Sequence, residues 1–303
     1  MKITDIEIFV VDGGRKKWLF SAVRTDEGIT GYGEFGYGTV AKSLVGLIED
    51  IKPLVIGRDP RAVEKLYFDL YRALRQVPGG IAQMGIAAIE LACWDIKGKA
   101  LELPVSHLVG GPHRDSQRVY WSHMGSARAH NPSLALDKPL KDWEAVASAT
   151  REVSERGYDA FKTNIFWPGE SPRAISQGRD GINHDQRVDT ELLRHAEKQI
   201  SVMRDAAGNS IDILLDVNSN FKTEGVIRLA KALEPYKLFW IEHDNESPQA
   251  LAQLRDSTSI SLASGEEHFT TREYLPYFEL RAMDTVLVDV QWQGFGPSKK
   301  VAD

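Results

Sequence analysis

The sequence has a single cysteine, Cys93, so it cannot form an intrachain disulfide. This absence excludes the small disulfide-stabilised scaffolds that are typical of secreted proteins. No run of about 18 apolar residues, the length that a helix needs to cross a bilayer, occurs in the chain. The opening segment MKITDIEIFVV alternates polar and apolar residues and lacks the unbroken apolar core of a signal peptide. We therefore expect a cytoplasmic protein without a membrane partner.

The chain also lacks any block of like charges, and its 37 Lys and Arg residues are outnumbered by 43 Asp and Glu residues. Its formal net charge is −6 at neutral pH. Nucleic acids and anionic membranes are bound by clustered Lys and Arg, so neither is an expected partner. The composition indicates a globular protein whose expected partner is a small molecule or another copy of the same chain.

What the chain does have is length enough for two domains, because 303 residues exceed the usual size of one domain. Residues 1–35 read as short strands around the turns Asp12-Gly13-Gly14 and Asp26-Glu27-Gly28, which predicts a small antiparallel meander. From residue 40 to about residue 108 the apolar period becomes helical. We therefore expect an α+β domain over residues 1–115, ending near Gly110-Gly111-Pro112.

The second part of the chain changes to alternating strands and amphipathic helices, which is typical of a parallel sheet covered by helices. The expected strands are residues 119–124, 158–165, 212–217, 238–242, 259–264 and 285–290. We therefore predict an α/β domain over residues 116–303. The spacing of the later strands suits a barrel and an open doubly wound sheet equally well.

Four successive strands of this domain end in an acidic residue, at Asp216, Glu242, Glu266 (or Glu267) and Asp289. On a closed barrel such side chains converge at the C-terminal mouth, where the active sites of barrels lie. Carboxylates packed together repel one another, and a divalent cation relieves the repulsion. Ligands that are all oxygen favour Mg²⁺ over zinc. The alternative is that exposed strand ends in an acidic protein carry these residues without a shared role.

A glycine motif offers a competing interpretation. Gly31, Gly33 and Gly36 match G-x-G-x-x-G and precede a helical stretch, as in dinucleotide-binding sites. The preceding strand, however, joins the motif through the turn at residues 26–28, which makes an antiparallel hairpin. A dinucleotide site needs the first βα turn of a parallel sheet, so we expect no nucleotide cofactor.

The stretch AAIELACWDIKGKALELPVSHLVGG, residues 87–111, resembles the signature of the mandelate racemase/muconate lactonizing enzyme branch of the enolase superfamily. The D-x-N at Asp216 and Asn218, the WIE at Glu242 and the ASGE at Glu266 are similar to the three strand ends that bind Mg²⁺ in that family. The resemblance extends over essentially the whole chain.

This resemblance implies an α+β capping domain over a (β/α)₇β barrel, with Asp216, Glu242 and Glu266 as the Mg²⁺ ligands. It also implies a first step in which the metal and a basic residue convert a carboxylate substrate to its enolate by removing the α-proton. The α-proton of a carboxylate is very weakly acidic, so the dianion has to be stabilised as it forms. More than one subunit is implied as well.

Two positions depart from the family pattern. Many members carry K-x-K on the second barrel strand, the second lysine being a base, whereas this chain has Lys162-Thr163-Asn164. Lys162 can still neutralise a carboxylate oxygen, but Asn164 cannot take a proton. We assign Asn164, Asn218 and His268 to substrate binding. Asp289 is similar to the aspartate of an Asp-His dyad whose histidine comes from the seventh strand, and the chain ends at Asp303 before such a strand.

The predicted barrel is also short. From Arg118 onward the chain has 186 residues, fewer than the lower limit of about 200 for a (β/α)₈ barrel. An open barrel of six strands exposes two sheet edges and part of its core. We therefore expect either a native polypeptide that is longer than this chain or an incomplete barrel that depends on oligomerisation.

Other residues are candidates for the surroundings of the site. His243 and His268 directly follow the acids at the mouth, and His184 lies in a polar segment; each is also well explained as a supporting or solvated residue. Arg15, Lys16 and Lys17 lie in a segment, residues 14–20, that resembles the loop covering the site in this family; they could meet an anionic substrate, or form a charged turn. Trp292 and Phe295 either line the pocket or pack in the core.

We predict a Mg²⁺-dependent acid-sugar dehydratase that removes the α-proton and then loses the β-hydroxyl as water, with Lys162 and Asp289 as catalytic residues. The choice rests on Asn164, because racemisation needs a base on each face of the substrate and elimination needs only one. A racemase, epimerase or cycloisomerase of the same family is the alternative among enzymes. An inactive, truncated homologue with a structural role is the alternative of another class.

Overall fold

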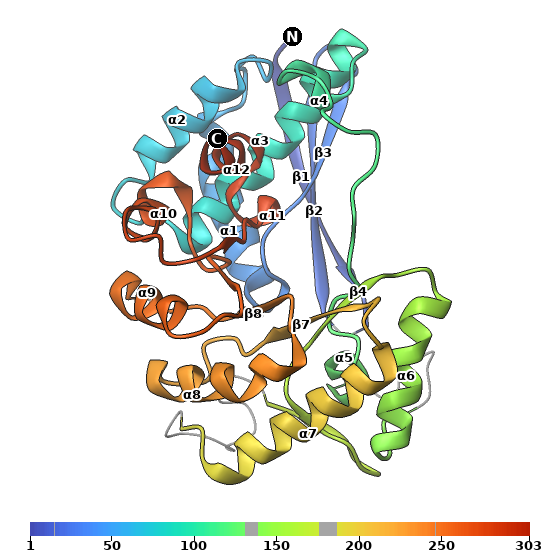
Figure 1. Cartoon of the computed structure of the whole chain (residues 1–303). Coiled ribbons are helices and arrows are strands. Elements are labelled where there is room, and N and C mark those ends of the chain that lie inside the picture. The colour runs from blue at the N-terminus through green and yellow to red at the C-terminus, as the bar shows by residue number, and fades with distance from the viewer. Residues whose placement is uncertain (15, 131–138, 176–186, 246) are drawn as a thin grey trace. The chain divides into compact units, whose positions relative to one another are not determined.

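The computed structural model describes residues 1–14, 16–130, 139–175, 187–245 and 247–303, and it divides into two compact units (Figure 1). The first unit consists of Met1–Ser116, Glu267–Leu275 and Val288–Asp303, and the second of Gln117–Glu266 and Pro276–Leu287. None of the helices in the described ranges combines the length and the apolar composition that a membrane span needs. The candidates Arg15 and His184 lie outside the described residues.

The first three strands form the antiparallel meander predicted for residues 1–35. β1 (Ile3–Asp12), β2 (Lys17–Thr25) and β3 (Thr30–Glu34) pair in the order β1-β2-β3. One face of this sheet packs against helices, so that Ile6, Leu19 and Val23 are buried in the core of the first unit. The prediction of a small antiparallel sheet is therefore confirmed.

Helices complete the N-terminal part of the first unit. They are η1 (Gly38–Val40), α1 (Ala41–Ile51), η2 (Lys52–Leu54), α2 (Val63–Ala73), α3 (Gly80–Leu101) and α4 (Val105–Leu108). α1 and α2 each bury one apolar stripe, whereas α3 buries residues on several faces, which is the pattern of a central helix. Cys93 lies inside α3 and is fully buried, as expected of a packing residue.

Close contact between α3 and β3 explains the glycine motif. A Cβ atom at Gly31 would lie 2.0 Å from the carbonyl oxygen of Ala92, and one at Gly33 would lie 2.9 Å from Cβ of Leu91. Among the described residues, β3 pairs with the antiparallel β2 alone, so the motif does not occupy the first βα turn of a parallel sheet. These glycines permit the strand to lie directly on the helix.

The C-terminal segment also packs in the first unit, through α11 (Val290–Gln293) and α12 (Phe295–Ala302). Glu90 of α3, which is 4% exposed, accepts hydrogen bonds from the backbone N–H groups of Phe295 (2.8 Å) and Gly296 (2.7 Å). Gln83 donates to the carbonyl oxygen of Gln293 at 2.7 Å. Residues 288–303 therefore group with the N-terminal unit by their contacts, and the predicted boundary between residues 115 and 116 stays a prediction.

The second unit is built on a parallel sheet. Its strands are β4 (Ala160–Thr163), β7 (Asp212–Asp216), β8 (Trp240–Glu242), β9 (Leu262–Ser264) and β10 (Thr285–Val286), in the order β10-β9-β8-β7-β4. The elements between and before them are α5 (Ser126–His130), α6 (Trp143–Glu155), α7 (Thr190–Ala207), α8 (Thr223–Leu233), η3 (Glu234–Tyr236), α9 (Pro248–Asp256) and α10 (Thr270–Glu279). Residues 270–275 of α10 group with the first unit and residues 276–279 with the second. A short hairpin, β5 (Phe166–Trp167) and β6 (Arg173–Ala174), follows β4. The predicted alternation of strands and helices around a parallel sheet is confirmed.

Two of the six predicted strands differ from the prediction. Residues 119–124 lie beside β4 through the single parallel bridge Trp121–Phe161, and the backbone then turns at His123, whose φ of 53° is left-handed and cannot continue a strand. The strand predicted over residues 285–290 ends at Val286, and Asp289 stands at the start of α11. Within the described residues the sheet therefore has five strands. In place of a sixth strand, Trp121 forms a single bridge to β4.

The pleat of the parallel sheet separates its residues into two faces. Phe161, Ile213, Leu215, Ile241 and Leu262 belong to the large core cluster that includes the helices. The alternate residues Ala160, Leu214, Trp240 and Ala263 form a small apolar cluster on the other face, joined by Tyr120 and Leu287. Lys162, Asp216 and Glu242 alternate with the large core cluster in the same way, so they share the face of the small cluster and continue it toward the carboxyl ends of the strands.

Candidate active site

Strand register brings three of the predicted site residues together. Asp216 is the direct Cα partner of Glu242 on the neighbouring strand, and Lys162 pairs with Leu214, two residues before Asp216. Because residues two apart point to the same face, the three side chains converge at one edge of the sheet. Lys162, Asp216 and Glu242 are 7%, 4% and 1% exposed.

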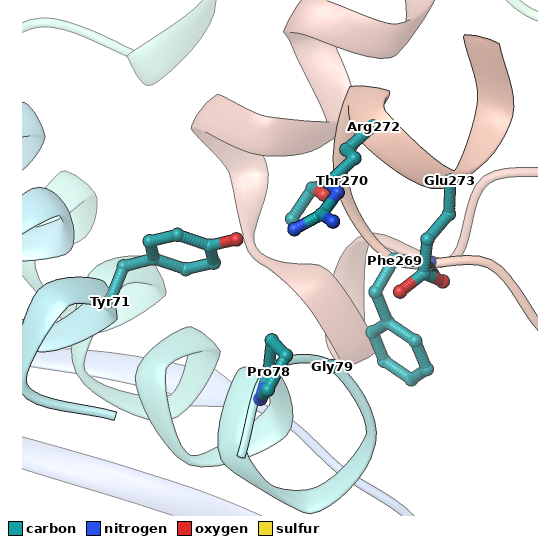
Figure 2. A pocket seen from close by; sticks show the side chains of 7 residues that line it. All are labelled: Tyr71, Pro78, Gly79, Phe269, Thr270, Arg272 and Glu273. Carbon is teal, nitrogen blue, oxygen red and sulfur yellow. Dashed lines mark hydrogen bonds between the residues drawn. The ribbon is translucent and has the colours of Figure 1, made fainter. Parts of the chain in front are cut away.

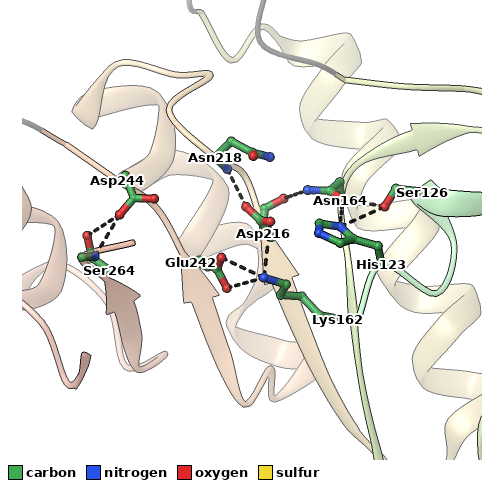
Figure 3. A network of polar contacts seen from close by, with 10 residues as sticks. His123, Ser126, Lys162, Asn164, Asp216, Asn218, Glu242, Asp244 and Ser264 are labelled. Atoms are coloured by element: carbon green, nitrogen blue, oxygen red, sulfur yellow. Dashed lines mark hydrogen bonds and ion pairs between the residues drawn. The ribbon is translucent and has the colours of Figure 1, made fainter. Parts of the chain in front are cut away.

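The ammonium of Lys162 lies between the two carboxylates (Figure 3). Its Nζ is 2.8 Å and 3.0 Å from the two oxygens of Glu242 and 3.6 Å from Oδ2 of Asp216. Burial by itself would lower the pKa of Lys162, but the charges of Glu242 and Asp216 outweigh it and raise the pKa. Lys162 is therefore a protonated, hydrogen-bond-donating cation at neutral pH and not a base.

Negative charge is in excess at this edge, because two carboxylates share one ammonium. Burial and the neighbouring Asp216 raise the pKa of Glu242 to about 7 despite the contact with Lys162. Adding a divalent cation would relieve this excess, and the available carboxylate oxygens are the donors that Mg²⁺ prefers. The donor chemistry of Asp216 and Glu242 therefore fits the predicted metal.

The predicted third ligand follows one strand further along. Glu266 lies in the turn two residues beyond the end of β9. Across the described ranges, no three His, Cys, Asp or Glu side chains stand close enough together to hold a metal ion as they are placed. Asp216 and Glu242 are thus assembled as a pair, and the role of Glu266 stays a prediction.

Asn218 belongs to a tight turn directly after β7. Its backbone N–H donates to Oδ1 of Asp216 at 2.8 Å, and its φ of 49° is left-handed. The carbonyl oxygen of Asn218 is 2.7 Å from Nδ1 of the buried His243. Burial lowers the pKa of His243, so the neutral ring donates its Nδ1–H to this carbonyl. His243 therefore supports the turn that carries Asp216 and Asn218.

Asn164 is held by a network that the sequence did not reveal. Its Oδ1 accepts a hydrogen bond from the hydroxyl of Ser126 at 2.6 Å and lies 2.9 Å from Nδ1 of His123. Its Nδ2 donates to the carbonyl oxygen of Asp216 at 2.9 Å. Asn164 thus connects β4 to β7 and presents an oriented amide beside the site (Figure 3). His123 stands at the end of the predicted first strand, the position that marked the other site residues, and that signal could have identified it.

Asp244 is a second residue that the sequence analysis missed. It is 6% exposed, and its Oδ1 accepts hydrogen bonds from the hydroxyl of Ser264 at 3.1 Å and from the backbone N–H of Gly265 at 2.9 Å. The contact fixes the end of β9 immediately before Glu266. Glu242 and Asp244 are two residues apart, so a further acid on the WIE strand end was visible in the sequence.

The remaining predicted residues, His268 and Asp289, belong to the first unit, as do Trp292 and Phe295. The ring of Trp292 lies edge-on to Tyr37 at 6.2 Å, and that of Phe295 lies edge-on to Trp94 at 5.4 Å. The two aromatic residues therefore have packing partners inside that unit. The roles of His268 and Asp289 stay predictions.

Two family models match the chain. Residues 8–110 match the mandelate racemase/muconate lactonizing enzyme N-terminal domain, and residues 144–303 match the enolase C-terminal domain-like model. A D-galactonate dehydratase from Xanthomonas euvesicatoria pv. vesicatoria is 34% identical over 277 residues, which cover 90% of this chain and 64% of the dehydratase. The chain thus spans less than two thirds of the length of that relative.

Solved structures resemble the chain over its full length. A protein from Burkholderia xenovorans strain LB400, described as a candidate L-alanine-DL-glutamate epimerase, is 34% identical with a TM-score of 0.95, covering 100% of this chain and 77% of that protein. A second structure of the Burkholderia protein, bound to magnesium and fumarate, has a TM-score of 0.93 and 34% identity, covering 99% of this chain and 75% of that protein.

Proposed function

The chain belongs to the mandelate racemase/muconate lactonizing enzyme family of the enolase superfamily, and from this premise we propose that it acts on an acid sugar as a Mg²⁺-dependent dehydratase. The reaction removes the proton α to the carboxylate and eliminates the β-hydroxyl as water, giving a 2-keto-3-deoxy acid. We include in the proposal a cytoplasmic location and a homo-oligomer, with neither nucleic acid nor membrane as a partner.

One observation carries the proposal: a buried, protonated Lys162 stands against Glu242 and Asp216 at the carboxyl edge of a parallel sheet. In this position its ammonium can donate to a substrate carboxylate oxygen that displaces part of its contact with Glu242. Charge that develops on that oxygen as the α-proton leaves is then stabilised by a cation already in place. The raised pKa keeps the ammonium charged throughout.

Asp216, Glu242 and Glu266 would hold Mg²⁺, which when bound neutralises negative charge on the substrate carboxylate and its enolate. A magnesium ion is present in the structure of the Burkholderia neighbour. The paired carboxylates of Asp216 and Glu242 support the assignment, because together they exceed the charge of Lys162. Asp244, through Ser264 and Gly265, would set the position of Glu266.

Asn164 favours elimination over racemisation. Its amide is occupied by Ser126, His123 and the carbonyl oxygen of Asp216, and an amide does not accept a proton near neutral pH. With Lys162 protonated, β4 supplies no base. Racemisation needs a base on each face of the substrate, so the face on the side of β4 lacks one. Elimination needs only one proton acceptor. We propose that Asp289 takes part in accepting this proton, as the aspartate of an Asp-His dyad does.

Exchange of the α-proton with solvent tests the proposal. The chain is incubated with Mg²⁺ in D₂O with D-galactonate and other aldonic acids, and NMR follows deuteration at the α-carbon and formation of a 2-keto-3-deoxy product. We expect both with at least one acid, and neither in Glu242→Gln. Exchange that persists in Glu242→Gln would contradict the ligand assignment, and exchange without any product or isomer would contradict the elimination.

An epimerase is the second candidate, favoured by the description of the Burkholderia structural neighbour. An isomeric product that forms without loss of water in the same experiment would support it. If none of the tested acids exchanges its α-proton, the alternative of an inactive homologue with a structural role would replace both the dehydratase and the epimerase.

A further inference from the structure

A cavity in the first unit is lined by none of the residues assigned to the dehydratase. It has a volume of about 290 Å³ and is lined by Tyr71, Pro78, Gly79, Phe269, Thr270, Arg272 and Glu273 (Figure 2). These residues come from α2, from the turn before α3 and from the start of α10. The volume is at the lower end of the range for ligand sites, which suits a molecule smaller than a nucleotide.

Three polar groups of the lining have capacity left for a ligand. Within the part of the chain that the structure describes, the guanidinium of Arg272 and the hydroxyl of Tyr71 make no hydrogen bond or ion pair. Figure 2 shows the hydroxyl of Tyr71 directed toward Arg272. Glu273 uses Oε2 to accept the backbone N–H of Phe269 at 2.7 Å, which orients the carboxylate and leaves Oε1 for another partner.

Arg272 and Glu273 are adjacent in α10, and adjacent helical residues point in different directions. The two charges therefore do not neutralise each other, and the structure contains no ion pair between them. One cation and one anion thus border a single cavity at separate positions. A ligand that carries both an anionic and a cationic group complements this arrangement.

Glycine at position 79 keeps the anionic side open. A Cβ atom there would lie 3.2 Å from Oε1 of Glu273 and 3.9 Å from the ring of Phe269, and the φ of 75° is unfavourable for any other residue. Thr270, on the same wall, has a φ of 62°, which is rare for a β-branched residue. Its N–H is held by Oε1 of the buried Gln293 at 3.0 Å, so the strained backbone is fixed by its surroundings.

We propose that this cavity binds a small zwitterion, an amino acid with a short side chain. The carboxylate of the ligand pairs with Arg272 and accepts the hydroxyl of Tyr71, while its ammonium donates to Oε1 of Glu273. Phe269 and Pro78 supply apolar contacts for the side chain. The site goes beyond the dehydratase proposal, since it uses none of Lys162, Asp216 or Glu242.

Saturation-transfer NMR on the whole chain with EDTA tests this site, using L-alanine against propionate, which lacks the ammonium, and ethylamine, which lacks the carboxylate. We expect saturable binding of L-alanine and much weaker binding of the two partial analogues. Arg272→Gln and Glu273→Gln should each lower the affinity for L-alanine by at least about tenfold, because hydrogen bonds to charged groups contribute that much. Arg194→Gln and Glu279→Gln, which change exposed residues outside the cavity, should bind as the unmodified chain does.

Equal binding of propionate and L-alanine, with no effect of Glu273→Gln, would overturn the zwitterion and indicate a simple anion site. Absence of saturable binding for a panel of glycine, L-alanine, L-serine and L-valine would overturn the site altogether. Asp216→Asn separates the two proposals, because it should leave L-alanine binding unchanged. Loss of binding in that variant would place the ligand at the sheet edge and contradict the cavity.

Discussion

The ammonium of Lys162 contacts two buried carboxylates, so the stability of the protein depends on the charge of this one residue. Removal of the ammonium in Lys162→Met leaves Asp216 and Glu242 buried without a counter-charge, and breaking a buried pair costs about 3–5 kcal/mol. Protonation of Glu242 relieves the repulsion, so the raised pKa of this residue predicts that the loss grows as pH rises from 5 to 8. Urea unfolding of the metal-free protein at both pH values measures this.

The matched control is Lys198→Met, which changes an exposed lysine of α7 and should alter the free energy of unfolding by less than about 0.5 kcal/mol. A loss of the same size at pH 5 and pH 8 in Lys162→Met would contradict the electrostatic explanation.

A single hydroxyl orients Asn164. In Ser126→Ala the amide oxygen of Asn164 loses a buried hydrogen bond of 2.6 Å, which should lower the free energy of unfolding by about 1–2 kcal/mol. If the dehydratase proposal holds, the α-proton exchange rate should fall as well, because the amide is less well positioned. Ser122→Ala, at an exposed serine of the same segment, should change neither quantity, and equal behaviour of the two variants would remove Asn164 from the site.

At the scale of elements, the contact between β3 and α3 depends on glycine. Gly31→Ala places a methyl group 2.0 Å from the carbonyl oxygen of Ala92 and 2.6 Å from Cγ1 of Ile96, so the helix and the strand must separate. We expect a loss of about 2–3 kcal/mol in chemical unfolding, as for other overpacked cores. Gly46→Ala is the control inside α1, where an added Cβ atom would have no atom within 4 Å apart from its chain neighbours and the backbone of its own helix, and it should stabilise by about 0.5–1 kcal/mol. A tolerated Gly31→Ala would mean that the motif serves another purpose.

The contact of α7 with β5 adds a pH dependence. His195 of α7 stacks on Trp167 at 4.6 Å, and its Nε2 lies 2.9 Å from the carbonyl oxygen of Phe166. Burial lowers the pKa of His195 below its ordinary value of 6.5, although the Phe166 carbonyl opposes this. The unfolded chain therefore binds the proton first as pH falls, and the stability that depends on the neutral ring is present above pH 6.5 and lost below it.

In His195→Phe the ring stack is retained and the titrating group is removed. At pH 8 we expect a loss of about 1 kcal/mol from the missing hydrogen bond. The difference from the unmodified chain should shrink as pH falls below 6.5, and thermal unfolding over that range measures it. A difference that stays constant with pH would show that His195 does not titrate differently on folding.

At the scale of the whole molecule, the excess carboxylate at the sheet edge links metal binding to stability. Mg²⁺ at a hundred times its Kd should raise the free energy of unfolding by about 2.7 kcal/mol, and EDTA should reverse the gain. Asp216→Asn should abolish the effect, whereas Asp205→Asn, at an exposed residue of α7, should retain it. Stabilisation that survives in Asp216→Asn would locate the metal elsewhere.

The local patterns of the sequence determined the elements and the family. Polar and apolar alternation predicted the meander at residues 1–35, and repeated strand and helix signals predicted the parallel sheet, because the periodicity of each strand and helix is a local property of the chain. The signature at residues 87–111 indicated the family that the comparisons support. Acidic residues at successive strand ends indicated Asp216 and Glu242, since parallel strands bring their carboxyl ends to one edge.

Contacts between distant residues were decided only by the tertiary structure. Whether Lys162 is a base or a cation depends on how closely Glu242 and Asp216 approach it, and the burial of all three sets that distance and charge. The network of Asn164 with His123 and Ser126 needs the backbone to turn at His123, and no local pattern specifies a left-handed residue there. Periodicity in the sequence encodes which face a side chain takes, whereas the folded packing alone fixes its distance, its burial and its protonation.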